Sequence, residues 1–112
     1  MRLFYASLLI IVAAASCAGP SASTHFQRVD GGHVDLVLKA PAARNVELAA
    51  SVDGFRPRVA HARGMGLWVV RMPADQEFTY FYLVDGHPYK PACDMTERDD
   101  FGGADCLFSP GP

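Results

Sequence analysis

The sequence predicts an all-β domain, a β-sandwich of about seven short strands. Short apolar runs recur about every ten residues from His33 onward, and turn-forming glycine, proline and aspartate residues separate them. Apolar residues within these runs alternate at period two, and no stretch has the 3.6-residue period of an amphipathic helix. Several short strands at this spacing are typical of two packed antiparallel sheets.

The expected strands follow one another with turn signals between them. Residues 39–44 turn the chain after the first strand, Asp53-Gly54 lies at the tip of a loop, and a long loop rich in aspartate and glycine spans 91–104. The segment 58–62 is expected to be a weak edge strand. In chain order, the predicted strands are 33–38, 45–50, 58–62, 67–72, 78–84, 88–90 and 106–109.

The strand predicted at 78–84 is unusual because both of its faces are apolar. One face carries Phe78, Tyr80, Tyr82 and Val84, and the other carries Thr79, Phe81 and Leu83. Such a strand is either covered on both sides or leaves one face free to bind a ligand. Asp85-Gly86 tolerates the positive φ angles of a two-residue turn, so we expect a hairpin with 88–90.

The N-terminal segment has the layout of a secretory signal peptide. Arg2 supplies a positive charge, and the run from Leu3 to Ala15 is apolar apart from Ser7. This run is short for a membrane span, which needs about 20 residues. We therefore predict that residues 1–16 are a signal peptide.

The sequence AASC at 14–17 resembles a bacterial lipobox, in which the cysteine is acylated and becomes the mature N-terminus. We expect Cys17 to carry lipid and residues 17–24 to form the anchor and linker. Ordinary signal-peptidase cleavage after Ala15 or Ala18 is the alternative. Ala18 is not the aspartate that retains lipoproteins at the inner membrane. The prediction is therefore a protein of the bacterial cell envelope, anchored in the outer membrane and facing the periplasm.

The chain has three cysteines, and an odd thiol is awkward in an oxidising compartment. If Cys17 is acylated, Cys93 and Cys106 remain as a pair that can close a loop, a disulfide worth about 3 kcal/mol in the chain-entropy estimate. Two free thiols or thiols that bind a metal are the alternatives. A metal is disfavoured, because no C-x-x-C spacing is present and no histidine lies near the pair in sequence.

Composition narrows the classes of function. The net charge of −2 gives no basic footprint for nucleic acid. No G-x-S-x-G, phosphate-loop or zinc motif is present, so we expect no enzyme and no cofactor. The acidic loop at 94–105 lacks calcium-loop spacing and is expected to be solvated. The four histidines are scattered, which favours surface or turn positions, and Trp68 is expected to lie in the core.

Five short motifs occur in a fixed order within 33–109. They are ARNVEL at 43–48, SVDGF at 51–55, GLW at 66–68, YFYLVDG at 80–86 and DDFGG at 99–103. This order resembles the glycogen-binding domain of the AMP-activated protein kinase β subunit and the early-set domains that precede the barrels of isoamylases and branching enzymes. The resemblance implies that residues 25–112 form one immunoglobulin-like early-set β-sandwich.

The resemblance also suggests binding residues. Phe55 stands where sugar-binding members have their first stacking tryptophan, and Tyr89 is the aromatic residue nearest the second. Phe81 aligns with a lysine that binds sugar hydroxyls, and Asp105 or Cys106 falls at a sugar-binding asparagine. The lysine and asparagine are thus missing, and Phe55, Phe81 and Tyr89 are the predicted stacking platform.

These expectations combine into a non-catalytic envelope lipoprotein whose glycogen-binding-like domain binds an α-glucan or another glycan. The alternative is a protein-interaction or structural module that has lost sugar binding and whose same face contacts another envelope protein.

Overall fold

The computed structural model describes residues 24–111, which form ten strands in two antiparallel sheets. The predicted all-β sandwich is confirmed, with more strands than the seven expected. Within residues 24–111, no helix is long and apolar enough to cross a membrane. The elements are β1 (Thr24–Asp30), β2 (His33–Lys39), β3 (Val46–Ala50), the 3₁₀ turn η1 (Ser51–Asp53), β4 (Arg58–Val59), β5 (His61–Ala62), β6 (Leu67–Pro73), β7 (Phe78–Val84), β8 (His87–Tyr89), β9 (Thr96–Arg98) and β10 (Ala104–Phe108).

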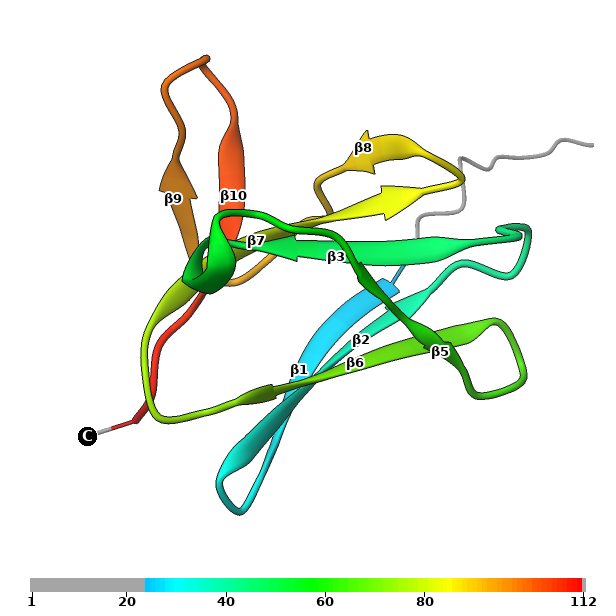
Figure 1. The fold of residues 1–112 in the computed structure, drawn as a ribbon, viewed down its shortest axis with the longest axis horizontal. Helices are drawn as coiled ribbons and strands as arrows, with labels where there is room; N and C mark the ends of the chain where they lie inside the picture. The colour runs from blue at the N-terminus through cyan, green and yellow to red at the C-terminus, as the bar shows by residue number, and fades with distance from the viewer. Residues whose placement is uncertain (1–23, 112) are drawn as a thin grey trace, which may run out of the picture.

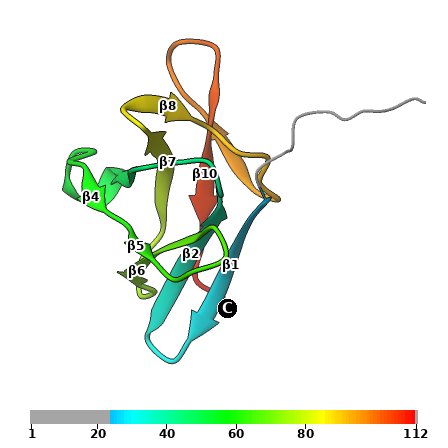
Figure 2. The same cartoon turned by 90° about the vertical axis from the view of Figure 1, so that its right-hand side faces the viewer.

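The two sheets lie face to face (Figure 1). One sheet has the strand order β1-β2-β6-β5, and the other has the order β4-β3-β7-β10-β9, with β8 paired to β7. In both views, β8 and the loop between β9 and β10 lie at the same end of the molecule (Figures 1 and 2). This end therefore belongs to the second sheet and carries two segments that are separate in sequence.

Two strands lie where the sequence predicted none. Thr24, assigned to the linker, begins β1, which pairs along its full length with β2. β9 lies inside the predicted loop 91–104 and pairs only with β10. β1 is mostly exposed and β9 entirely so, and neither shows the apolar alternation on which the prediction depended. Pairing with a neighbouring strand forms them instead.

The core lies between the inner faces of the sheets. Its largest fully buried side chains are Tyr80, Tyr82, Leu36, Leu38, Leu48, Met72, Val34, Val46 and Cys106. The predicted alternation of side chains on β7 is confirmed: Phe78, Tyr80 and Tyr82 point into the core, and Phe81 points outward. Trp68 packs against this core, and its Nε1 donates a hydrogen bond to the Ala40 carbonyl at 3.2 Å.

The predicted disulfide between Cys93 and Cys106 is confirmed, with a Cα–Cα distance of 5.6 Å. Cys106 is buried on β10, whereas Cys93 lies in the segment that precedes β9. The bond therefore ties this segment to the core. The predicted signal peptide 1–16 and the predicted lipidation site Cys17 lie outside the described residues.

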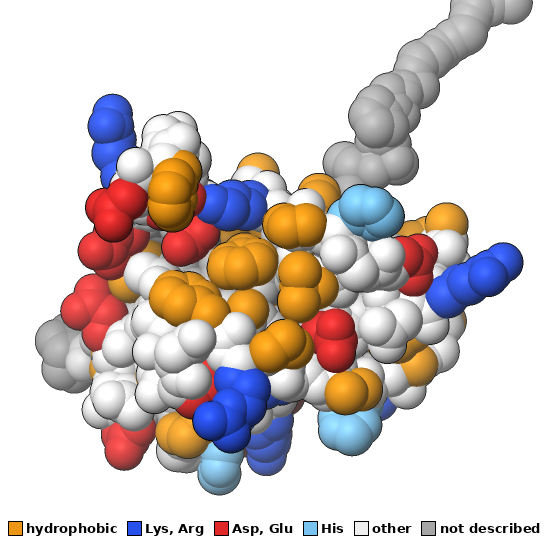
Figure 3. All heavy atoms as spheres, turned by 45° about the horizontal axis from the view of Figure 1, so that its top comes forward, with side chains coloured by type: hydrophobic (Ala, Val, Ile, Leu, Met, Phe, Trp, Pro, Cys, Tyr) orange, Lys and Arg blue, Asp and Glu red, His pale blue; other side chains and the backbone are white. Residues whose placement is uncertain are grey.

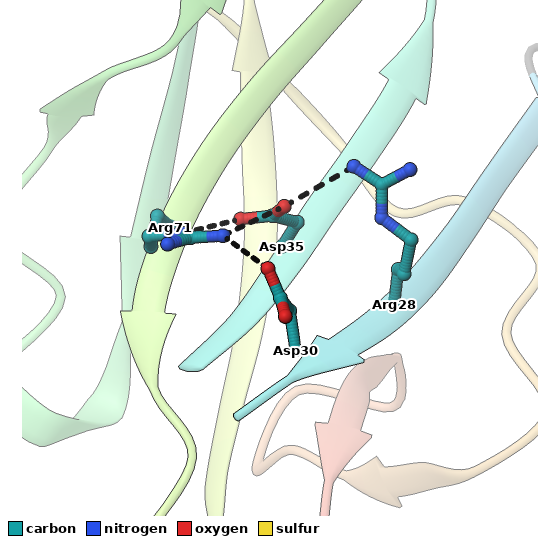
Figure 4. Close-up of polar contacts among 4 residues, drawn as sticks. All are labelled: Arg28, Asp30, Asp35 and Arg71. Atoms are coloured by element: carbon teal, nitrogen blue, oxygen red, sulfur yellow. Dashed lines mark hydrogen bonds and ion pairs between the residues drawn. The ribbon is translucent and has the colours of Figure 1, made fainter. Parts of the chain in front are cut away.

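The outer face of the first sheet carries a network of paired charges (Figure 4). Asp35 on β2 is buried and lies directly between Arg28 on β1 and Arg71 on β6. Arg71 Nε donates to Asp35 Oδ1 at 2.9 Å, and the other carboxylate oxygen lies 3.3 Å from Arg28. Arg71 also pairs with Asp30. The hydrogen bond from Arg71 is the main reason that the pKa of Asp35 is lowered.

Candidate functional site

The outer face of the second sheet presents a stacked pair of aromatic rings. Phe81 projects from β7 on the side opposite Tyr80 and Tyr82, and Phe55 follows η1. The ring centroids of Phe55 and Phe81 are 5.9 Å apart, with an angle of 26° between the ring planes. Phe55 keeps 39% of its surface exposed. Two of the three predicted platform residues are therefore in contact and open to solvent.

The backbone holds Phe55 in an unusual conformation. Gly54 and Phe55 both have positive φ, 75° and 65°, and Phe55 N donates to the Ala50 carbonyl at 2.8 Å. A bulky side chain in the left-handed region costs about 1–2 kcal/mol, a cost that glycine avoids. A phenylalanine at this position therefore strains the backbone, while its ring extends the exposed aromatic surface.

An open groove of ≈ 560 Å³ runs from the aromatic pair to the β9–β10 loop. Figure 3 shows hydrophobic side chains gathered on this face, bordered by acidic and basic groups. Phe101, in the loop, is 94% exposed. The groove is lined by Phe55, Phe81, Pro88, Lys90, Arg98, Asp99, Asp100, Phe101 and Asp105. It thus combines aromatic rings with charged hydrogen-bonding groups.

Lys90 is the central polar group of the groove. Its Nζ lies 5.8 Å from the centroid of the Phe81 ring and pairs with the carboxylates of Asp99 and Asp105. These pairings, Asp99 first, raise the pKa of Lys90. An ammonium has three donors and only one is used in the hydrogen bond to Asp99, so donors remain for a ligand. Lys90 directly follows β8, so the end of the β7–β8 hairpin places an ammonium group beside Phe81.

Asp99 organises the loop that carries Phe101. Its Oδ1 accepts hydrogen bonds at 2.8 Å from the backbone N–H groups of Phe101 and Gly103, and its Oδ2 accepts one from Lys90. The bond from Lys90, followed by the two backbone bonds, lowers the pKa of Asp99 to about 2. The Asp99 carboxylate is thus committed to internal partners.

Tyr89 lies apart from the other two platform residues. It pairs with Tyr82 across the hairpin, and directly opposed residues share a face, so Tyr89 packs against the core. Pro88 takes the groove side instead. The predicted two-residue turn is present, with φ of 50° at Asp85 and 83° at Gly86. The three predicted platform rings therefore do not come together. Tyr89 was chosen as the nearest aromatic in sequence, but its position on β8 places it on the core-facing side of the hairpin.

Several groove residues were not predicted. Lys90 and Pro88 could have been found by counting faces from the Asp85-Gly86 turn, since the turn fixes the register of β8. Phe101 stands within the DDFGG motif, but nothing in the sequence indicated that it would line the same groove as Phe81. That placement depends on the β9–β10 pairing, which has no apolar signature.

His25 corrects another expectation. It was expected at the surface, but it is half-buried beside the core, where both of its ring nitrogens are hydrogen-bonded. Burial lowers its pKa, and the hydrogen bond to the Val37 carbonyl opposes this effect. The other three histidines, at 33, 61 and 87, are exposed as expected.

No protein-family model matches this chain, and a comparison with curated proteins finds no match. The similarity to glycogen-binding domains thus depends on the order of motifs in the sequence. The chemistry of the groove has to be inferred from its own residues.

Proposed function

We propose that this protein is a non-catalytic carbohydrate-binding lipoprotein of the bacterial cell envelope. Its groove binds an α-glucan or another neutral glycan, and a lipidated Cys17 holds it to the membrane. The observation that carries the proposal is the exposed Phe55–Phe81 stack beside Lys90. The apolar face of a pyranose ring packs on aromatic side chains, and its hydroxyls need directed polar partners.

The polar rim suits a neutral ligand. Lys90 and Arg98 bring two positive charges, and Asp99, Asp100 and Asp105 bring three negative charges, so the lining carries a net charge of −1 (2 − 3). Lys90 pairs with two of these carboxylates, Asp99 and Asp105. Because the remaining field is weak, hydroxyl groups fit this rim better than a strongly anionic ligand.

Isothermal titration of maltoheptaose into the full chain carrying Cys17→Ser, which keeps it free of lipid, tests the proposal. We expect saturable heat and a raised melting temperature. Replacing Phe81 by alanine should weaken binding about twofold to tenfold, since a stacked ring contributes about 0.5–1.5 kcal/mol beyond its buried area. Phe26→Ala is the matched control, because it removes another solvent-exposed phenylalanine ring, 45% exposed, from β1 of the other sheet. Absence of heat with maltoheptaose and β-cyclodextrin would end the α-glucan proposal.

A second candidate function is a protein-interaction module of the envelope. The observation that favours it is Phe101, a large apolar side chain with 94% exposure at the edge of the groove. An envelope protein retained by the wild-type chain, lost with Phe81→Asp and unaffected by maltoheptaose would support this function. Competition by the glucan would instead assign the face to sugar.

A further inference from the structure

His25, Cys93 and Cys106 meet in space although they come from three distant segments. One atom from each residue, the two sulfurs and an imidazole nitrogen, lies within 4.8 Å of the other two. Cys106 is buried, whereas the other two are partly exposed. No histidine lies near the two cysteines in sequence, but the fold brings His25 beside them.

Two thiolates and one imidazole are a donor set typical of Zn²⁺. Zinc binds sulfur at about 2.3 Å and nitrogen at about 2.0–2.1 Å in tetrahedral geometry, so its neighbouring donors lie roughly 3.4–3.8 Å apart. The two sulfurs are bonded to each other in the disulfide and would move apart to this spacing once that bond is broken. The imidazole nitrogen already lies within 4.8 Å of both sulfurs, so side-chain rotation can bring it to ligand distance. A cavity of ≈ 270 Å³ adjoins the cluster and is also lined by Asp94 and Met95. A fourth ligand can therefore come from the protein or from water.

The hydrogen bonds of His25 prepare it for such a role. Its Nδ1 lies 2.9 Å from the Val37 carbonyl oxygen, which can only accept, so Nδ1 carries the proton in the neutral ring. Nε2 keeps its lone pair and accepts a hydrogen bond from the Tyr80 hydroxyl at 2.7 Å. Metal-binding histidines commonly donate their other N–H to a carbonyl in this way, which fixes the tautomer and the ring orientation.

We propose that reduction of the Cys93–Cys106 disulfide converts this cluster into a Zn²⁺ site with His25 as the third ligand. A dithiol reductant gives two electrons and two protons; the S–S bond breaks, two protein thiols form, and the reductant becomes a disulfide. Zn²⁺ then displaces one proton from each thiol, and Nε2 of His25 exchanges the Tyr80 hydroxyl for the metal. The disulfide and the metal are thus two alternative ways to link Cys93 to Cys106.

The test uses the reduced full chain carrying Cys17→Ser, so that Cys93 and Cys106 are the only thiols. Titration with Co²⁺, a spectroscopic substitute for zinc, should give thiolate-to-metal absorption and tetrahedral visible bands, which Zn²⁺ then abolishes. His25→Gln should weaken binding by at least about tenfold. His61→Gln is the matched control, because His61 is exposed on β5 and should leave binding unchanged. The oxidised protein should show no bands.

Reduction of the disulfide can lower the stability of the domain, so melting temperatures with and without Zn²⁺ provide a second test of metal binding. Zn²⁺ should raise the melting temperature of the reduced protein and should have little effect on reduced His25→Gln, because a ligand stabilises only the state that binds it. Reduced protein that shows no thiolate bands, or that melts at the same temperature with and without Zn²⁺, overturns the proposal. Equal affinity in His25→Gln overturns the role of the histidine.

Discussion

At the scale of single residues, Phe55 combines an unfavourable backbone conformation with a favourable aromatic contact. Its φ of 65° suits glycine, yet its ring stacks on Phe81. Met65 has a similar φ of 55° but is 90% exposed. Both residues therefore have a similar backbone strain, but only Phe55 makes an aromatic contact.

Glycine substitutions at these two positions separate strain from stacking. Met65→Gly should stabilise the domain by about 1 kcal/mol by relieving the left-handed strain. Phe55→Gly should change the free energy of unfolding by less than about 1 kcal/mol, because a lost aromatic pair worth about 0.5–1.5 kcal/mol offsets the same relief. Urea denaturation measures both values. Glycan binding should weaken only in Phe55→Gly, and a large loss of stability there would show that the ring serves the fold.

The loop that borders the groove should lose its native conformation at acid pH, because the ionised Asp99 carboxylate holds it. The folded-state pKa of Asp99, about 2, lies below the ordinary value of 3.8, so its ionised form favours the native loop above about pH 4. This contribution is lost as the pH falls through 2. We expect the amide signals of Phe101 and Gly103 to stay constant from pH 7 to pH 4 in NMR spectra and to shift between pH 4 and pH 2. The same shift in Asp99→Asn would show that another group causes it.

At the scale of elements, the turn before β6 positions two strands through one close contact. Gly66 has a φ of 77°, and a Cβ added there would lie 2.8 Å from the Pro41 Cβ. Its carbonyl accepts a hydrogen bond at 2.8 Å from Ala40 N. The absence of a side chain at Gly66 thus lets the segment after β2 pack directly on this turn.

Alanine substitutions in this turn test the contact. Gly64 has a φ of 84° with nothing within 4 Å of an added Cβ, so Gly64→Ala should cost only the left-handed penalty, about 1 kcal/mol. Gly66→Ala should cost about 2–4 kcal/mol, because the steric clash with Pro41 adds to that penalty. Thermal or urea unfolding compares the two variants. Equal costs would mean that the backbone conformation alone matters.

Strands could be predicted from the sequence where one buried face gives an alternation of apolar residues. β2, β3, β6 and β7 have apolar inward faces, and the Asp85-Gly86 turn has the residues that its φ angles require. β1 and β9 were missed because exposed edge strands carry no such pattern. In the site, Phe55 and Phe81 were found, while Lys90 and Phe101 depended on strand register and on long-range pairing.

At the scale of the whole molecule, the two outer faces differ in chemistry. The first sheet pairs its charges internally around Asp35 (Figure 4). The second sheet leaves aromatic rings exposed beside Lys90 and the β9–β10 loop (Figure 3). Phe55 and Phe101 thus leave apolar surface in contact with water at the second face.

Attachment to the membrane is a separate prediction for the whole chain. Each buried methylene of an acyl chain contributes about 0.8 kcal/mol, so a multiply acylated Cys17 should hold the protein at the membrane. Cys17→Ser expressed in a bacterial host should move the protein to the soluble fraction after export. Quantitative immunoblotting of fractionated envelopes measures this, and unchanged membrane association would contradict a lipid anchor at Cys17.

The most direct measurement is NMR mapping of maltoheptaose binding on ¹⁵N-labelled Cys17→Ser protein. The proposed function predicts saturable shifts at Phe55, Phe81, Lys90 and the 99–105 loop, with the amides of β1 and β5 unchanged. Shifts that are absent, or that cluster on the sheet around Asp35, would contradict glycan binding in the groove.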